Sequence, residues 1–159
     1  MSYKNQYSLF KDIHPFQNTK IDNRYNAIQI GDAGETLVSF NLKKLGFCVI
    51  PTPQGSLYDH ILDLNGIYLR IQTKSLSNPK NKMHYSFTRG FHASKTGVYH
   101  YNSDDFDISA CVNLFDEKVL FSFGVNKNIY WSRSCFLKEN ATIDSLNSSI
   151  NKFLNKNAA

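Results

Sequence analysis

The dipeptide Asn65-Gly66 constrains the fold of this chain more than any other feature of its sequence. It separates two strand-like runs, residues 57–64 and 67–75, and Asn-Gly between such runs is the strongest short-range signal for a two-residue type I′ hairpin turn. A turn of two residues also fixes the register of the strands, because Leu64 must then lie opposite Ile67. The sequence therefore predicts an antiparallel hairpin whose pairs can be counted outward from the turn.

This register decides which side chains share a face of the hairpin. Asp59 falls opposite Gln72, and directly opposed residues point to one face with Cβ atoms about 4.5–5.5 Å apart. Lys74 shares that face because side chains alternate along a strand with a period of two. His60 falls on the other face, where we expect a core histidine. That face also collects the apolar residues Leu62, Leu64, Ile67, Leu69 and Ile71. Three polar groups are thus predicted to converge on one side of a strand pair whose other side is apolar.

The remaining elements follow from hydrophobic periodicity. An amphipathic helix is predicted from Ile30 to Leu45, with Gly46 as its stop. Residues 47–50 predict a short buried strand that Pro51 ends. Further strands are expected at 85–88, 106–115 and 119–123, and an amphipathic helix at about 142–156. The fold class is α/β, a mixed β-sheet flanked by helices. We expect residues 1–25 to form an N-terminal arm and residues 26–159 a single domain.

Composition narrows the class of protein. The chain has 159 residues, 42% of them hydrophobic, which is typical of a folded globule rather than of a disordered chain. No apolar run approaches the ~20 residues that span a bilayer, and the first residues lack the apolar core of a signal peptide, so we expect a cytoplasmic protein without a membrane partner. The spacing of Cys48, Cys111 and Cys135 favours neither a zinc site nor a disulfide framework. A net charge of +5 favours a polyanionic partner.

A helix Glu, an Asp at the start of a strand and Gln-Thr-Lys on the paired strand resemble the active site of the PD-(D/E)xK nuclease superfamily, the restriction-endonuclease-like proteins. The matching segments are residues 31–35, 55–59 and 71–74, and residues 105–110 resemble the strand that follows the catalytic core. The resemblance covers about residues 28–123. It is nearest to the small homing-type endonucleases of cyanobacteria and phages, in which Gln also occurs at the second acidic position.

The resemblance implies a role for each site residue. Mg²⁺, with Mn²⁺ as a substitute, would be bound by the Asp59 carboxylate, the Gln72 side-chain oxygen and the Thr73 backbone carbonyl. Glu35 would reach the metal directly or through water, and Lys74 would orient the attacking water or stabilise the transition state. Gln72 stands where the family usually has Asp or Glu. An amide oxygen brings no charge, so we expect weaker metal affinity and a need for millimolar Mg²⁺.

The resemblance also implies double-stranded DNA as the partner. Basic residues that follow the catalytic strand are expected to contact phosphates. These are Lys80, Lys82, Arg89 and Lys95. Arg70 is expected either to contact DNA or to pair with Asp63. A subunit this small would need to act as a homo-oligomer, a dimer or tetramer, to recognise a long or symmetric site. Site-specific double-strand cleavage of the homing type is favoured. A Holliday-junction resolvase and a non-catalytic DNA-binding module of the same fold stay open as alternatives.

Overall fold

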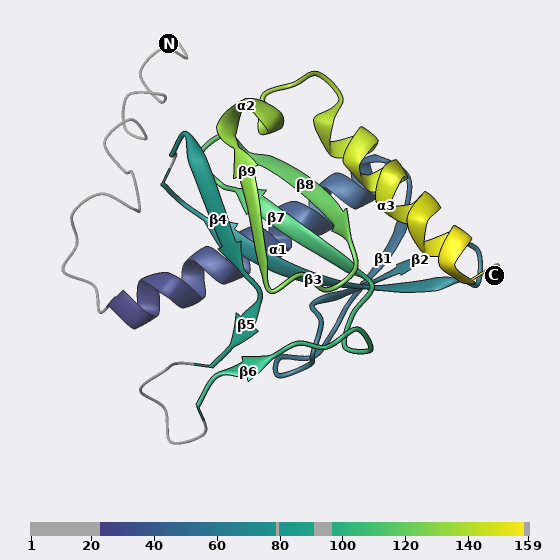
Figure 1. The fold of residues 1–159 in the computed structure, drawn as a ribbon, viewed down its shortest axis with the longest axis horizontal. Helices are drawn as coiled ribbons and strands as arrows, with labels where there is room; N and C mark the ends of the chain where they lie inside the picture. Colours follow the sequence, from purple (N-terminus) through teal and green to yellow (C-terminus); the bar gives the residue numbers. More distant parts are fainter. Residues whose placement is uncertain (1–22, 79, 91–96, 158–159) are drawn as a thin grey trace, which may run out of the picture.

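The computed structural model describes residues 23–78, 80–90 and 97–157 of the chain (Figure 1). Its elements, in chain order, are α1 (Asn23–Lys44), β1 (Cys48–Pro51), β2 (His60–Asp63), β3 (Tyr68–Leu76), β4 (Lys82–Ser86), β5 (Thr88–Arg89), β6 (Tyr99–His100), β7 (Ile108–Asn113), β8 (Lys118–Phe123), β9 (Asn128–Ser132), α2 (Arg133–Phe136) and α3 (Ala141–Asn157). Five strands form a mixed sheet in the order β1-β2-β3-β7-β8, in which only β3 and β7 run parallel. Two smaller sheets pair β4 with β9 and β5 with β6.

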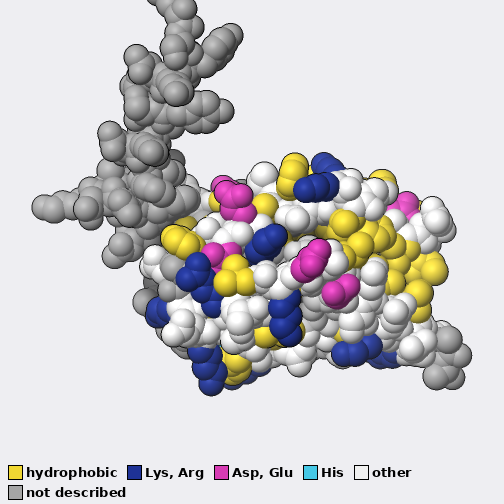
Figure 2. Space-filling view, turned by 90° about the horizontal axis from the view of Figure 1, so that it is seen from above, with side chains coloured by type: hydrophobic (Ala, Val, Ile, Leu, Met, Phe, Trp, Pro, Cys, Tyr) yellow, Lys and Arg dark blue, Asp and Glu magenta, His cyan; other side chains and the backbone are white. Residues whose placement is uncertain are grey.

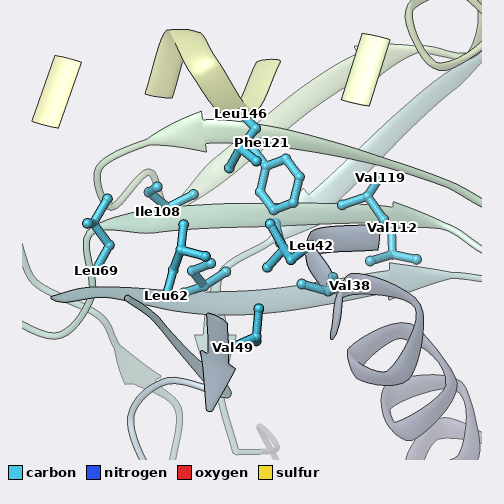
Figure 3. Packing of buried hydrophobic residues seen from close by; sticks show 12 residues of the cluster. Val38, Leu42, Val49, Leu62, Leu69, Ile108, Val112, Val119, Phe121 and Leu146 are labelled. Atoms are coloured by element: carbon cyan, nitrogen blue, oxygen red, sulfur yellow. The ribbon is translucent and has the colours of Figure 1, made fainter. Parts of the chain in front are cut away.

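The central sheet carries a hydrophobic layer on each face. On one face, Val38 and Leu42 of α1 and Leu146 of α3 pack against strand residues that include Leu62 and Phe121 (Figure 3). On the other face, a second cluster joins β4 and β9 to the sheet and to α2. Successive strand residues point to opposite faces, and Ala110 and Cys111 of β7 accordingly lie in different clusters. This mixed sheet flanked by helices confirms the predicted fold class.

The hairpin register predicted from Asn65-Gly66 is confirmed. Residues 60–63 pair with residues 71–68 in that order, which is the register that a two-residue turn requires. Leu64 and Ile67 exchange backbone hydrogen bonds of 2.8 and 3.4 Å across the turn. Both turn residues have positive φ, 56° for Asn65 and 95° for Gly66, as type I′ demands. The buried apolar face is confirmed for His60, Leu62, Leu69 and Ile71, whereas Ile67, beside the turn, is 46% exposed.

The ladder between β2 and β3 ends one pair before Asp59. His60 pairs with Ile71, and the Asp59 N–H then donates to the carbonyl of the same Ile71 at 2.8 Å. The structure differs from the prediction at this point, since Asp59 is not a formal ladder partner of Gln72. Although β3 continues to Leu76, no strand of the described residues pairs with its β2-facing edge beyond this point. This unpaired stretch of edge is where the polar residues gather.

Helix α1 begins at Asn23, so it includes the last three residues of the predicted arm, and residues 1–22 of the arm lie outside the described residues. Gly46, with φ of 89°, ends the helix as predicted. Gly34 lies directly against β3, since a Cβ at this position would be 2.8 Å from Ser75 Cβ. Leu45, expected on the buried stripe, is 36% exposed. The close approach at Gly34 sets how near the adjacent Glu35 comes to the strand.

The strand predicted at residues 47–50 is present one residue later, at 48–51, but the prediction that it is buried is wrong. β1 forms the edge of the sheet, with only Val49 buried, and Pro51 belongs to the strand. An edge strand tolerates proline because one side of its backbone needs no ladder partner. The C-terminal helix lies where the apolar periodicity placed it, as α3. Among the described residues, no helix is long and apolar enough to cross a membrane.

Candidate active site

Asp59 is the centre of the polar group at the open edge of β3. Its Oδ2 atom accepts the backbone N–H of Thr73 at 2.7 Å and the side-chain N–H of Gln72 at 2.9 Å. The predicted meeting of Asp59 and Gln72 is therefore present, although it is made by the side chains rather than by ladder pairing. Burial raises the pKa of Asp59, and the Thr73 N–H and the charge of Lys74 oppose that rise. The carboxylate is thus held in place by donors while it is partly shielded from water.

Two neutral oxygens lie beside this carboxylate. The Gln72 amide also donates to the Thr73 carbonyl at 3.2 Å, and its own Oε1 atom is buried without a hydrogen-bond partner. In a strand, the N–H and C=O of one residue point to the same side. Since the Thr73 N–H points to Asp59, the Thr73 carbonyl points to the same open edge. A buried oxygen without a partner is costly unless something fills its lone pairs.

Glu35 and Lys74 approach the same place from α1 and from β3. Burial, together with the charges of Asp59 and Asp32, raises the pKa of Glu35 to about 7. Burial lowers the pKa of the Lys74 ammonium, and the charges of Asp59 and Glu35 raise it again. All three groups line one cavity, so their charges are close enough to interact. Perturbed groups gathered in one cleft are typical of functional sites.

A cavity of about 360 Å³ brings the four predicted residues together. Its walls include Glu35, Asp59, Gln72 and Lys74, with the Thr73 backbone between the last two. Two large polar side chains without a predicted catalytic role also line the cavity, Arg89 of β5 and Tyr101. Arg89 donates to the carbonyl of Gly55 at 2.6 Å, which ties β5 to the loop that leads to Asp59. No sequence pattern links Tyr101 to the hairpin, and sequence reasoning missed it.

The predicted basic residues separate into three groups. Arg89 lies in the cavity wall, whereas Lys80 and Lys82 are exposed and do not line the cavity. Lys95 falls outside the described residues. The alternative pairing of Arg70 with Asp63 is wrong. Arg70 makes an ion pair with Asp107 of 2.9 Å and a further hydrogen bond to the Asp104 carbonyl.

Asp63 serves the turn instead. Its carboxylate accepts a hydrogen bond of 2.7 Å from the N–H of Gly66, a residue of the hairpin turn. Asp107 directly precedes β7, and the pairing of β7 with β3 brings it to Arg70. The Arg70 guanidinium is therefore bound by Asp104 and Asp107 of the loop before β7, and this argues against a role of Arg70 in contacting DNA.

The oxygen atoms of the site fit a hard divalent cation such as Mg²⁺, which binds oxygen ligands. Asp59 and Glu35 supply carboxylates, Thr73 supplies a carbonyl, and the unpartnered Gln72 Oε1 would gain the partner that it lacks. In the part of the chain that the structure describes, no group of three or more His, Cys, Asp or Glu side chains is arranged to hold a metal. Asp59 and Glu35 are the two carboxylates of the site, and Gln72 beside them is neutral.

The raised pKa of Glu35 makes a prediction about stability. The unfolded chain releases this proton near pH 4.5 and the folded protein near pH 7, so the free energy of unfolding falls as pH rises between these values. In EDTA at pH 8 we expect Glu35→Gln to melt at a higher temperature than the wild type. A gain of about 1 kcal/mol corresponds to roughly 2–4 °C in a domain of this size. At pH 4 the two proteins should melt together.

Thermal melts at both pH values test this, with the exposed Glu139→Gln as the matched control. A divalent cation should stabilise the wild type more than Glu35→Gln, because the variant has one ligand fewer. Equal melting temperatures of the wild type and Glu35→Gln at pH 8 would show that burial and the neighbouring carboxylates do not destabilise the charged form of Glu35.

Comparisons with known proteins agree with this geometry. The sequence profile of a family described as PD-(D/E)XK endonuclease matches residues 25–155. Among solved structures, a bacterial homing endonuclease, I-Ssp6803I, is similar with a TM-score of 0.51 and 21% sequence identity. The match covers 71% of this chain and 84% of that one. No curated protein matches the chain significantly in sequence.

Proposed function

The chain belongs to the PD-(D/E)XK endonuclease family, and from that premise we propose that it is a metal-dependent endonuclease that hydrolyses phosphodiester bonds in DNA. The observation that carries the proposal is the convergence of Glu35, Asp59, Gln72 and Lys74 on one cavity. Two carboxylates, two neutral oxygens and a lysine around one open strand edge suit the hydrolysis of a phosphodiester, which needs activated water and compensation of negative charge.

We assign the metal site to four residues. Asp59 and Glu35 would contribute carboxylate oxygens, Gln72 its Oε1 atom and Thr73 its carbonyl. When bound, Mg²⁺ or Mn²⁺ supplies positive charge against the phosphate oxygens and makes water a better nucleophile at neutral pH. The donors from Thr73 and Gln72 hold the Asp59 carboxylate in one orientation before any ligand arrives. Such preorganisation lowers the cost of binding the ion.

Lys74 would act on the substrate. Its ammonium lies on the same strand as Gln72 and in the wall of the same cavity, so it can contact a phosphate oxygen or orient the attacking water. Burial strengthens its field because the surrounding dielectric is low. Arg89, in the same wall, is placed to hold a neighbouring phosphate, as a guanidinium binds phosphate through two parallel hydrogen bonds.

Double-stranded DNA is the proposed substrate, and site-specific cleavage of the homing type is the proposed reaction. The support is the family and the fold shared with a homing endonuclease. The exposed Lys80 would add salt-dependent affinity through phosphate contacts, and the exposed Lys82 is likewise a proposed DNA contact. A subunit of this size offers a small contact surface, so we propose that it acts as a homo-oligomer, a dimer or tetramer.

Cleavage of supercoiled plasmid in Mg²⁺ tests the function. Wild-type protein should convert the plasmid to nicked and linear forms, and Lys74→Ala should leave it supercoiled. Lys152→Ala, an exposed lysine on α3, is the matched control and should cleave like the wild type. Equal cleavage by Lys74→Ala would remove Lys74 from the site.

The same experiment separates the alternatives. If the wild type binds DNA but never cleaves it, the chain is a non-catalytic module, an outcome that the neutral Gln72 makes worth testing. Cleavage confined to four-way junctions would instead identify a resolvase.

A further inference from the structure

The two-stranded sheet of β4 and β9, here called the β4–β9 ribbon, has two unlike faces. Met83, Tyr85 and Ile129 are buried against the central sheet and belong to its second hydrophobic cluster. The alternate residues point away from the protein. These outward residues are Lys82, His84, Ser86, Asn128, Tyr130 and Ser132, and all six are exposed. The ribbon is thus anchored by one face and presents an unbroken polar face with the other.

The outward side chains are ordered by contacts with one another. The ring of His84 stacks on the ring of Tyr130 with centroids 4.6 Å apart and planes inclined by 11°. His84 Nε2 lies 2.8 Å from Asn128 Oδ1, and Lys82 Nζ lies 5.3 Å from the centre of the Tyr130 ring. Yet Tyr130 remains 56% exposed. Polar groups held in fixed positions at a surface lose less entropy when they bind a partner.

The charge of this region favours a polyanion. Residues 80–90 and 127–133 contain five basic residues and no Asp or Glu. They are Lys80, Lys82, Arg89, Lys127 and Arg133. Arg133 is paired with Asp116 at 2.6 Å, which leaves four that form no ion pair with a carboxylate of the described residues. Figure 2 shows Lys and Arg side chains mostly on the half of the molecule that carries β4, while a hydrophobic area covers the half that carries α3.

The ribbon is continuous with the candidate active site. Arg89, in the cavity wall, lies only three positions after Ser86, the last residue of β4. A chain of three residues spans at most about 11 Å. A duplex with one phosphate in the cavity would therefore meet the ribbon within a few base pairs of that phosphate, because duplex DNA rises about 3.4 Å per base pair.

We propose that the outward face of the β4–β9 ribbon enters the major groove of double-stranded DNA and contacts base edges beside the cleaved phosphate. The position of these contacts beside the cleaved phosphate rests on the proposed function, whereas the binding of the ribbon to DNA does not. The major groove of B-form DNA admits a two-stranded ribbon, whereas the major groove of A-form RNA is too narrow for side chains to enter. Asn128 has the amide that pairs with adenine, and Lys82 the ammonium that contacts guanine. Specificity would thus reside on strands apart from the catalytic residues.

Selection of bound duplexes from a random-sequence library, without cleavage, tests the proposal. Wild-type protein in Ca²⁺ should enrich a sequence motif. The triple variant Lys82→Ala/Asn128→Ala/Tyr130→Ala should select only part of that motif, with discrimination falling by roughly 5- to 150-fold at each base pair that a removed side chain reads. All three residues are exposed, so the melting temperature should stay unchanged. Lys152→Ala/Asn147→Ala/Tyr68→Ala removes the same residue types from exposed positions elsewhere and should keep the motif.

The outcomes separate this proposal from the proposed function. A motif that persists in the ribbon variant, or affinity that falls equally for all sequences, would overturn base recognition by the ribbon while leaving cleavage untouched. A wild type that enriches no motif would overturn it as well. A wild type that selects a motif through the ribbon but never cleaves plasmid would support the ribbon and refute the nuclease activity.

Discussion

Replacing Asp59 by Asn should abolish DNA cleavage while the protein still folds and binds DNA. The amide of Asn has the shape of the carboxylate, so its oxygen can still accept the Thr73 and Gln72 donors. It lacks the negative charge that a metal ligand contributes. Removal of one hydrogen-bond donor to a transition state costs roughly 100- to 1,000-fold in rate, and we expect at least that loss here. Because burial raises the pKa of Asp59, removal of the charge should not lower the melting temperature.

Initial rates of plasmid nicking, gel-shift titrations and thermal melts together measure this. Asp144→Asn, an exposed acid on α3, is the control for loss of one negative charge and should nick at the wild-type rate. A variant that no longer cleaves because it has unfolded would show in the melt and would not count. Unchanged nicking by a folded Asp59→Asn protein would remove the proposed site.

Removal of the divalent metal should abolish DNA cleavage as completely as the Asp59→Asn substitution does. In excess EDTA we expect no nicking, with recovery on addition of Mg²⁺ or Mn²⁺. Recovery should need millimolar Mg²⁺, because Asp59 and Glu35 provide two negative charges and Gln72 none. Ca²⁺ should bind and block, since its larger and looser coordination shell does not position water for attack.

Cleavage rates across a metal titration give the first measurement, and melting temperatures across the same titration give a second one that is independent of catalysis. Gln72→Glu offers a direct check, because it restores the third carboxylate and should lower the Mg²⁺ concentration needed. Full activity in EDTA would exclude the mechanism.

The sequence predicted the features that depend on neighbouring residues. Asn65-Gly66 has one favoured turn geometry, and that geometry sets the register of β2 and β3 residue by residue. The stop at Gly46 and the periodicity of α3 are equally local. The turn geometry and the alternation of side chains along a strand therefore suffice to predict that Asp59, Gln72 and Lys74 converge, without any long-range contact.

Features that depend on distant neighbours were missed or misjudged. Residues 47–50 are apolar, yet only the position of β1 at the sheet edge explains why Ile50 is 45% exposed. β9 and α2 have five and four residues, too few to show a hydrophobic period. Arg70 meets Asp107 because β3 and β7 are parallel neighbours, and no local pattern indicates that pairing.

The β2–β3 hairpin also bears on the order in which the domain assembles. Asp59 and Gln72 are 13 residues apart in the sequence, and hairpins of this kind form within about 1–10 μs. The parallel pairing of β3 with β7 joins residues that are 37 positions apart, such as Arg70 and Asp107. Contacts between residues so distant in the sequence form later in folding, because a long loop must be closed first. Glu35 joins only when α1 docks on β3 at Gly34. A nascent or partly folded chain thus has the hairpin residues of the active site without Glu35. The site is complete, and cleavage can begin, only after α1 has packed on the sheet.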